Sequence, residues 1–181
     1  VIGKQQRRAM FAEVDLHGMN NDVDLGHPWK ETVLGCAAAH PMWQREITLW
    51  YDRWIEMAVP VLERSLRCLR ALRAKGVPVF ALSNFGVESF AYAETQYPLL
   101  GEFDRRYISG HLKMVKPDAA IYKYVETDSG IAPGRLLFAD DRADNIAAAE
   151  ARGWQVHLFD GEAGWAERLV SEGLLTQGEA A

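Results

Sequence analysis

Apolar side chains recur at helical intervals through the first third of the chain. Between residues 28 and 57 this spacing places five of them on one helical face: Trp43, Ile47, Trp50, Trp54 and Met57. Val59-Pro60 marks the end of this region, and a second amphipathic helix from Leu62 to Leu72 stops at Gly76. The pattern therefore predicts a helical subdomain over residues 1–58.

From residue 77 onward, short apolar runs alternate with helical patterns. The apolar runs predict strands at residues 77–82, 107–109, 136–139 and 155–159. Helices are predicted over residues 87–96, 117–125, 143–152 and 165–171. Pro117 is expected in the first helical turn, where its fixed φ is preorganised. The alternation predicts an α/β fold, with a Rossmann-like parallel sheet flanked by helices in a core domain over residues 59–181.

Polar residues follow three of the predicted strands. Ser83 and Asn84 come after the first strand, Lys116 after the second, and Asp140 and Asp141 after the third. The carboxyl ends of parallel strands face the same edge of a sheet, so we expect these residues to form one site. That site would combine anion donors, a fixed cation and the hard oxygen ligands that Mg²⁺ prefers. Such a set suits the binding of a phosphate.

Asp140 and Asp141 are the most informative pair in this set. Two ionised carboxylates about 4 Å apart repel by roughly 4 kcal/mol at an effective dielectric near 20, so a divalent cation or a cationic side chain is expected beside them. Each polar residue also has a simpler explanation when taken alone. Ser83, Asn84 or either aspartate would serve as a helix cap, and Lys116 as a solvated surface charge. Capping explains each residue but not their coincidence at successive strand ends.

Composition excludes several functional classes. The chain has 181 residues and a net charge of −5, which gives no basic surface for nucleic acid. Its two cysteines lack the spacing of a zinc site or a disulfide framework, and no apolar stretch reaches the ~18 residues of a membrane span, so a cytoplasmic protein is expected. The start at Val1 rather than Met suggests a missing upstream segment, and the polar residues 176–181 are expected to fray.

Three segments carry a family resemblance. Residues 81–84, 115–122 and 138–145 resemble, in order, the second, third and fourth motifs of the haloacid dehalogenase superfamily. The resemblance covers the chain from about Val61 to its end, and the helical first third resembles the cap of the phosphatase branch. Within the last motif, the resemblance implies that Asn145 supports the loop.

The resemblance also implies roles for the polar residues at the strand ends. Ser83 and Asn84 would bind the oxygens of the transferred phosphoryl group, and Lys116 would neutralise charge beside the nucleophile. Asp141 would be a direct Mg²⁺ ligand. Asp140 would bind Mg²⁺ through a water molecule or would support the groups that bind it. The family attacks phosphorus through an aspartate and forms an aspartyl-phosphate, which water then hydrolyses.

The first motif of the family, an apolar strand that runs into Asp-x-Asp, is missing. Asp22-Val23-Asp24 matches the letters, but the preceding residues 18–21 predict a turn rather than a buried strand. Asp15 lies in a segment with a helical pattern, which argues against it as the nucleophile. We therefore expect the first central strand and the nucleophile upstream of Val1, since a sheet without that strand leaves two neighbours unpaired. A strand from another molecule is the second explanation.

Three functions remain open. Adjacent acids at Asp140 and Asp141 favour a Mg²⁺-dependent phosphatase that acts on a small phosphate ester. A 2-haloacid dehalogenase is the alternative, although the resemblance implies Ser and Asn at those two positions in that branch. A truncated, inactive phosphate-binding relative is the third. The tryptophans at positions 43, 50 and 54 are expected either in the core of the cap or in an interface with another subunit. A homodimer formed through the cap is therefore a hypothesis.

Overall fold

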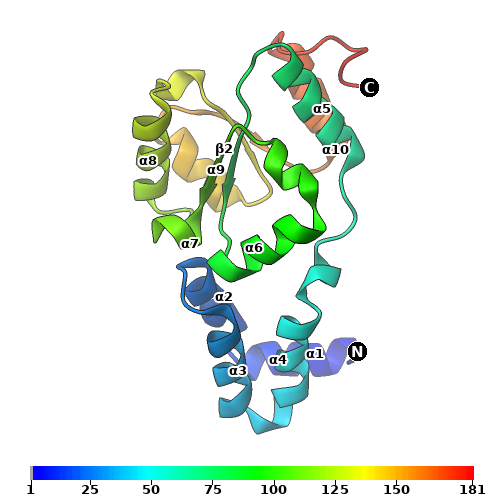
Figure 1. The fold of residues 1–181 in the computed structure, drawn as a ribbon, viewed down its shortest axis with the longest axis vertical. Helices are drawn as coiled ribbons and strands as arrows, with labels where there is room; N and C mark the ends of the chain where they lie inside the picture. Colours follow the sequence, from blue (N-terminus) through cyan, green and yellow to red (C-terminus); the bar gives the residue numbers. More distant parts are fainter. Residues whose placement is uncertain (1) are drawn as a thin grey trace. The chain divides into compact units, whose positions relative to one another are not determined.

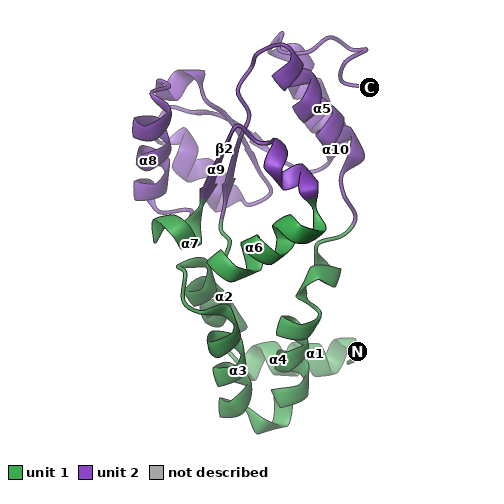
Figure 2. Cartoon of the chain, in the orientation of Figure 1, with its two compact units in different colours: residues 1–59, 84–97, 108–113 green, residues 60–83, 98–107, 114–181 purple. Residues whose placement is uncertain are grey.

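The computed structural model describes residues 2–181 as two compact units (Figures 1 and 2). Unit 1 holds the described part of residues 1–59 together with residues 84–97 and 108–113, and unit 2 holds residues 60–83, 98–107 and 114–181. The helical cap over residues 1–58 and the core over residues 59–181 stay a prediction about the domains. In the described part of the chain, no helix has both the length and the apolar character of a membrane span.

Unit 1 is helical, as the periodicity predicts. Its helices are α1 (Lys4–Glu13), α2 (Leu16–Asp24), α3 (Trp29–Ala39), α4 (Gln44–Asp52), α6 (Val87–Gln96) and α7 (Ser109–Leu112), with 3₁₀ turns at Pro41–Trp43 and Trp54–Met57. Val33 and Ile47 lie in its buried core, and Trp43, Trp50 and Trp54 pack against that core. Met57 does not join them, because α4 ends before Arg53, the chain continues as a 3₁₀ turn, and Met57 is 56% exposed.

Unit 2 contains the strands and four of the helices. The helices are α5 (Glu63–Ala74), α8 (Ala119–Ser129), α9 (Ala143–Glu150) and α10 (Glu162–Ser171), with 3₁₀ turns at Pro98–Glu102 and Pro133–Arg135. The strands are β1 (Phe80–Ser83), β2 (Arg105–Ile108, whose last residue is counted with unit 1), β3 (Leu137–Asp140) and β4 (Gln155–Leu158). This is the predicted helix and strand alternation, with strand ends shifted by at most three residues.

The strands form two pairs rather than one continuous sheet. β3 runs parallel to β4, in a register from Leu137 opposite Gln155 to Asp140 opposite Leu158, and β1 pairs with β2. Among residues 2–181, β1 and β3 therefore each pair along one edge only. The architecture is a Rossmann-like α/β fold with a helical cap.

The turn expected at residues 18–21 is wrong, because these residues lie inside helix α2. Asp15 caps this helix by accepting a hydrogen bond from the backbone N–H of Gly18, at 2.8 Å. Leu16, Met19 and Val23 then bury one face of it at helical spacing. Tertiary burial outweighs the weak helix propensity of the glycine and the two asparagines that follow it.

The expected position of Pro117 in the first turn of its helix is also wrong. Helix α8 begins at Ala119 with Asp118 in the N-cap position, and the Lys116–Pro117 peptide bond is cis. Pro117 therefore lies in the turn that leads from Lys116 to the helix.

The closing residues are packed rather than frayed, which contradicts a third expectation. Ala180 is buried in a cluster with Cys68 of α5 and Leu169 of α10. The guanidinium group of Arg64 donates a hydrogen bond to the carbonyl of Ala180, at 2.7 Å. Of the small side chains that suggested disorder, Ala180 is the one that packs against the two helices.

Candidate functional site

Lys116 joins the carboxyl ends of two strands of unit 2. Its ammonium nitrogen lies 2.5 Å from Oδ2 of Asp140, the last residue of β3, and 2.9 Å from the carbonyl oxygen of Leu82 in β1. The Lys116 and Asp140 side chains are only 9% and 6% exposed. A buried ion pair of this kind persists only when further hydrogen bonds complete its shell, which the Leu82 carbonyl helps to do.

The second carboxylate oxygen of Asp140 is also occupied. Oδ1 accepts hydrogen bonds from the backbone N–H of Arg142 and from the side-chain amide of Asn145, both at 2.9 Å. Charge repulsion between the adjacent acids is therefore relieved at Asp140 by a lysine and two N–H donors. Both oxygens of Asp140 already have protein partners in this arrangement.

Asp141 differs from its neighbour because it is exposed, directly after the end of β3. The next charged pair along the chain is Arg142 with Asp144, at 2.5 Å, and this pairing lowers the pKa of Asp144. Residues 2–181 contain no cluster of three or more His, Cys, Asp or Glu side chains that would by itself hold a metal. Mg²⁺ does not require one, because it is held by one or two carboxylates together with waters and substrate phosphate. Asp141 fits that mode of binding.

The simpler explanations for the polar residues do not hold. Gly86 occupies the N-cap position of α6, and no side chain caps that helix, so neither Ser83 nor Asn84 serves this purpose. Helix α9 likewise begins after Arg142 without a side-chain cap, which removes the capping explanation for Asp140 and Asp141. Burial of Lys116 removes the explanation of a solvated surface charge.

The predicted residues are therefore brought together in part. Lys116 and Asp140 are in contact, Asp141 is the next residue along the chain, and Ser83 follows the Leu82 carbonyl that binds Lys116. Asn84 is counted with unit 1, whereas the other four belong to unit 2. The carbonyl of Leu82 was not predicted, because a backbone acceptor carries no signal in the sequence.

The acidic residues near the start of the chain do not form a second strand-end motif. Asp15 caps α2, and Asp22 and Asp24 lie within that helix. Oδ2 of Asp24 accepts a hydrogen bond from the side-chain amide of Asn20, one helical turn earlier, at 2.9 Å. Their helical placement supports the conclusion that this Asp-x-Asp is not the family's first motif, although a helix rather than the expected turn precedes it.

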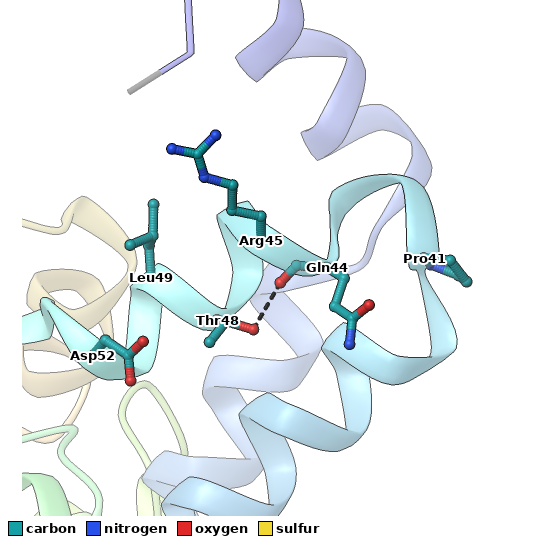
Figure 3. Close-up of a pocket in the computed structure, with 6 residues that line it drawn as sticks. All are labelled: Pro41, Gln44, Arg45, Thr48, Leu49 and Asp52. Atoms are coloured by element: carbon teal, nitrogen blue, oxygen red, sulfur yellow. Dashed lines mark hydrogen bonds between the residues drawn. The ribbon is translucent and has the colours of Figure 1, made fainter.

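A shallow depression of about 420 Å³ lies on unit 1, along the turn before α4 and α4 itself (Figure 3). It is lined by Pro41, Gln44, Arg45, Thr48, Leu49 and Asp52. None of the predicted site residues lines it, and the hydrogen bond from Thr48 to the Gln44 carbonyl belongs to the helix itself. It does not compete with the strand ends as a catalytic site.

A family model described as haloacid dehalogenase-like hydrolase matches residues 9–153. The chain belongs to the haloacid dehalogenase-like hydrolase family. This match confirms the family suggested by the three motifs, and it runs from within α1 to the end of α9, stopping before β4. The fold agrees with a predicted HAD-like family hydrolase from Porphyromonas gingivalis, with a TM-score of 0.70 and 21% identity over 93% of this chain and 85% of that one.

Two curated relatives of the chain are phosphatases by name. The D-ribitol-5-phosphate phosphatase of Bacteroides thetaiotaomicron is 29% identical over 134 residues, which cover 70% of this chain and 65% of the relative. A sesquiterpene phosphatase of Aspergillus oryzae is 30% identical over 98 residues, or 54% of this chain and 50% of the relative. The chain thus spans between half and two thirds of the length of these two relatives.

A solved structure adds a bound metal to the comparison. A HAD family enzyme from Bacteroides thetaiotaomicron, in complex with magnesium and inorganic phosphate, has a TM-score of 0.50 and 28% identity. The similarity covers 57% of this chain and 54% of that one.

Proposed function

We propose that the protein is a Mg²⁺-dependent phosphatase that acts on a small phosphorylated metabolite. The observation that carries the proposal is the buried ion pair of Lys116 and Asp140 directly beside the exposed Asp141. A fixed ammonium group neutralises the charge of a phosphoryl group in transfer, and an exposed carboxylate supplies a ligand for Mg²⁺. The phosphatases among the relatives, and the neighbour with magnesium and phosphate, support the same chemistry.

In this proposal each strand-end residue has a separate task. Ser83 and Asn84 bind the equatorial oxygens of the phosphoryl group, and Lys116 neutralises their charge. Asp141 is the direct metal ligand. Asp140 fixes the Lys116 ammonium group and reaches the metal through water, because its own oxygens already accept hydrogen bonds from the protein.

The attacking group is proposed to be an aspartate upstream of Val1. Its carboxylate oxygen would bond to phosphorus as the ester P–O bond breaks and the alcohol leaves, and water would then hydrolyse the aspartyl-phosphate to release inorganic phosphate. Two observations support this. The aspartates of α2 and its cap are held in a helical segment, and β1 and β3 each pair along one edge only among the described residues. A strand that bears the nucleophile would pair with those edges.

The helices of residues 1–58 are proposed to act as the cap that selects the substrate and to carry the interface of a homodimer. A 2-haloacid dehalogenase is the alternative activity. The paired acids at residues 140 and 141 disfavour it, because a metal-free displacement of halide has no need of an exposed carboxylate beside the buried one. An inactive phosphate-binding relative is the remaining alternative.

Phosphate release from para-nitrophenyl phosphate tests the activity. The protein extended by its natural upstream sequence is expected to release phosphate in MgCl₂ and to lose this activity in excess EDTA. Residues 1–181 alone are expected to bind Mg²⁺ without turnover. Chloride release from 2-chloropropionate in EDTA, without phosphate release, would instead establish the dehalogenase, and binding without either activity in the extended protein would establish the inactive relative.

Asp141→Asn tests the metal assignment, and Asp144→Asn is its matched control. Both residues are exposed aspartates, Asp141 directly after β3 and Asp144 in the first turn of α9, but Asp144 is paired with Arg142. We expect Asp141→Asn in the extended protein to lower the Mg²⁺-dependent rate by roughly 100-fold or more, because the metal supplies several kcal/mol of transition-state stabilisation. Asp144→Asn should stay within a few-fold of the unsubstituted protein. Equal losses in both variants would contradict the assignment.

A further inference from the structure

The hydroxyl group of Tyr122 is buried in the middle of unit 2, beneath the segment that bears Asp141. Tyr122 lies on α8 and is fully buried, with its ring packed edge-to-face against Phe138 and Trp154 at centroid distances of 6.0 and 5.4 Å. Phenylalanine would fill the same apolar space. The hydroxyl therefore requires an explanation of its own, because burial of an unpaired polar group is costly.

The hydroxyl donates a hydrogen bond to the backbone carbonyl of Asn145 in the first turn of α9, at 3.0 Å. The side-chain amide of Asn145, a residue only 2% exposed, in turn donates to Oδ1 of Asp140. Asp140 is itself held by Lys116. A continuous chain of hydrogen bonds thus connects Tyr122 to the site.

These bonds fix both ends of one short segment. At the first end, the Asp140 carboxylate accepts hydrogen bonds from the backbone N–H of Arg142 and the side-chain amide of Asn145. At the second end, the Tyr122 hydroxyl donates a hydrogen bond to the Asn145 carbonyl. Asp141 lies between the two anchors and is the exposed member of the segment. Burial raises the pKa of Tyr122, and nearby Asp140 raises it further, so the hydroxyl remains a neutral donor at physiological pH.

We propose that Tyr122 is a positioning residue, whose hydroxyl fixes residues 141–145 so that the Asp141 carboxylate is preset for Mg²⁺. The inference rests on the proposed function, because it assigns Asp141 to the metal. Groups that orient a metal ligand without touching the metal typically change affinity by 10-fold to 100-fold when removed. Presetting the ligand lowers the ordering cost of metal binding.

Tyr122→Phe tests the inference, and Tyr107→Phe is its matched control. Tyr107 is also buried in the strand-containing unit, and its hydroxyl donates to Oδ2 of Asp128 at 2.8 Å, away from the acid pair. Mg²⁺ affinity of the 181-residue chain would be measured by NMR titration with MgCl₂, followed at the amide of Asp141. Amide hydrogen exchange of residues 141–145 without metal is the second readout.

We expect Tyr122→Phe to weaken Mg²⁺ binding by roughly 10-fold and to speed exchange across residues 141–145. Tyr107→Phe should change neither quantity, although both variants lose one hydrogen bond of a buried tyrosine and some stability. Equal Mg²⁺ affinity with and without the Tyr122 hydroxyl would overturn the inference alone, even if exchange became faster. Absence of Mg²⁺ binding by the unsubstituted chain would overturn the metal-dependent function and the inference together.

Discussion

The ammonium group of Lys116 and the carboxylate of Asp140 form an ion pair that is more than 90% buried and connects the ends of two separately paired strands. Removal of one member leaves an uncompensated charge in the interior. We expect Lys116→Met to lower the free energy of unfolding by roughly 3–5 kcal/mol, measured by urea denaturation. Replacement of both members, in Lys116→Met with Asp140→Asn, should recover part of this loss.

The exposed pair of Arg53 and Glu56 is the control for that experiment. Both side chains are about half exposed, so Arg53→Met should change the free energy of unfolding far less than Lys116→Met. A cost of Lys116→Met that is equally small would show that Lys116 is solvated in solution.

Acid should weaken a second ion pair, between Glu126 of α8 and Arg152. The Arg152 guanidinium donates two hydrogen bonds to Glu126 and lowers its pKa, and a bond from the Trp154 indole acts in the same direction while burial opposes them. A carboxyl whose pKa is lowered in the folded state stabilises the fold above its unfolded pKa of ~4.3. That contribution is lost as the pH falls through the folded-state pKa.

Glu126→Gln should therefore be less stable than the unsubstituted chain by roughly 1–3 kcal/mol at pH 7. The difference should shrink below pH ~4, as Glu126 becomes protonated in the unsubstituted chain. Urea denaturation between pH 7 and pH 3 measures both effects. Glu150→Gln, at an exposed position, is the control and should show no such convergence. A difference independent of pH would contradict the prediction.

The sequence pattern places Ile47 and Met57 on one apolar helical face, but only Ile47 is buried in the structure. Ile47 is 1% exposed to solvent, and Met57 is 56% exposed. We expect Ile47→Ala to cost roughly 2–5 kcal/mol in urea denaturation, because it leaves a cavity in the core of unit 1. Met57→Ala should stay within about 0.5 kcal/mol. Similar costs for the two variants would mean that the helix continues through residue 57.

Deletion of residues 176–181 tests the packed tail. The deletion exposes the site of Ala180 between α5 and α10 and removes the hydrogen bond from Arg64, so we expect a loss of roughly 1–3 kcal/mol in thermal or urea unfolding. Lys75→Ala breaks only the exposed pair with Glu179 and serves as the control, with a much smaller expected loss of stability than the deletion. Unchanged stability after the deletion would show that the tail is frayed in solution.

Local patterns predict the elements better than the contacts between them. The helix over residues 87–96 agrees with α6 at both ends, since its apolar spacing and flanking glycine are local signals. The helix at residues 18–21 was missed because its stability comes from the Asp15 cap and from burial of Leu16 and Val23. The order of the motifs predicted that Asp140, Asp141 and Lys116 belong to one site. It did not predict which groups neutralise the charge of the Asp140 carboxylate.

The partner of Asp140 depends on contacts between residues far apart in sequence. Lys116 reaches Asp140 across 24 positions and the Leu82 carbonyl across 34. Tyr122 occupies an ordinary apolar position of a helix pattern, and its hydrogen bond to Asn145 appears only when α8 packs beside α9. Contacts of this kind between residues far apart in sequence can be identified only in the folded structure.

The division of the chain into two units has a spectroscopic consequence. Four of the six tryptophans, at positions 29, 43, 50 and 54, belong to unit 1, whereas Trp154 and Trp165 belong to unit 2. Intrinsic tryptophan emission is therefore weighted toward unit 1, while far-ultraviolet circular dichroism reports the helices of both. Denaturation curves that coincide by the two methods would indicate one cooperative transition, and curves that separate would identify which unit loses its structure first.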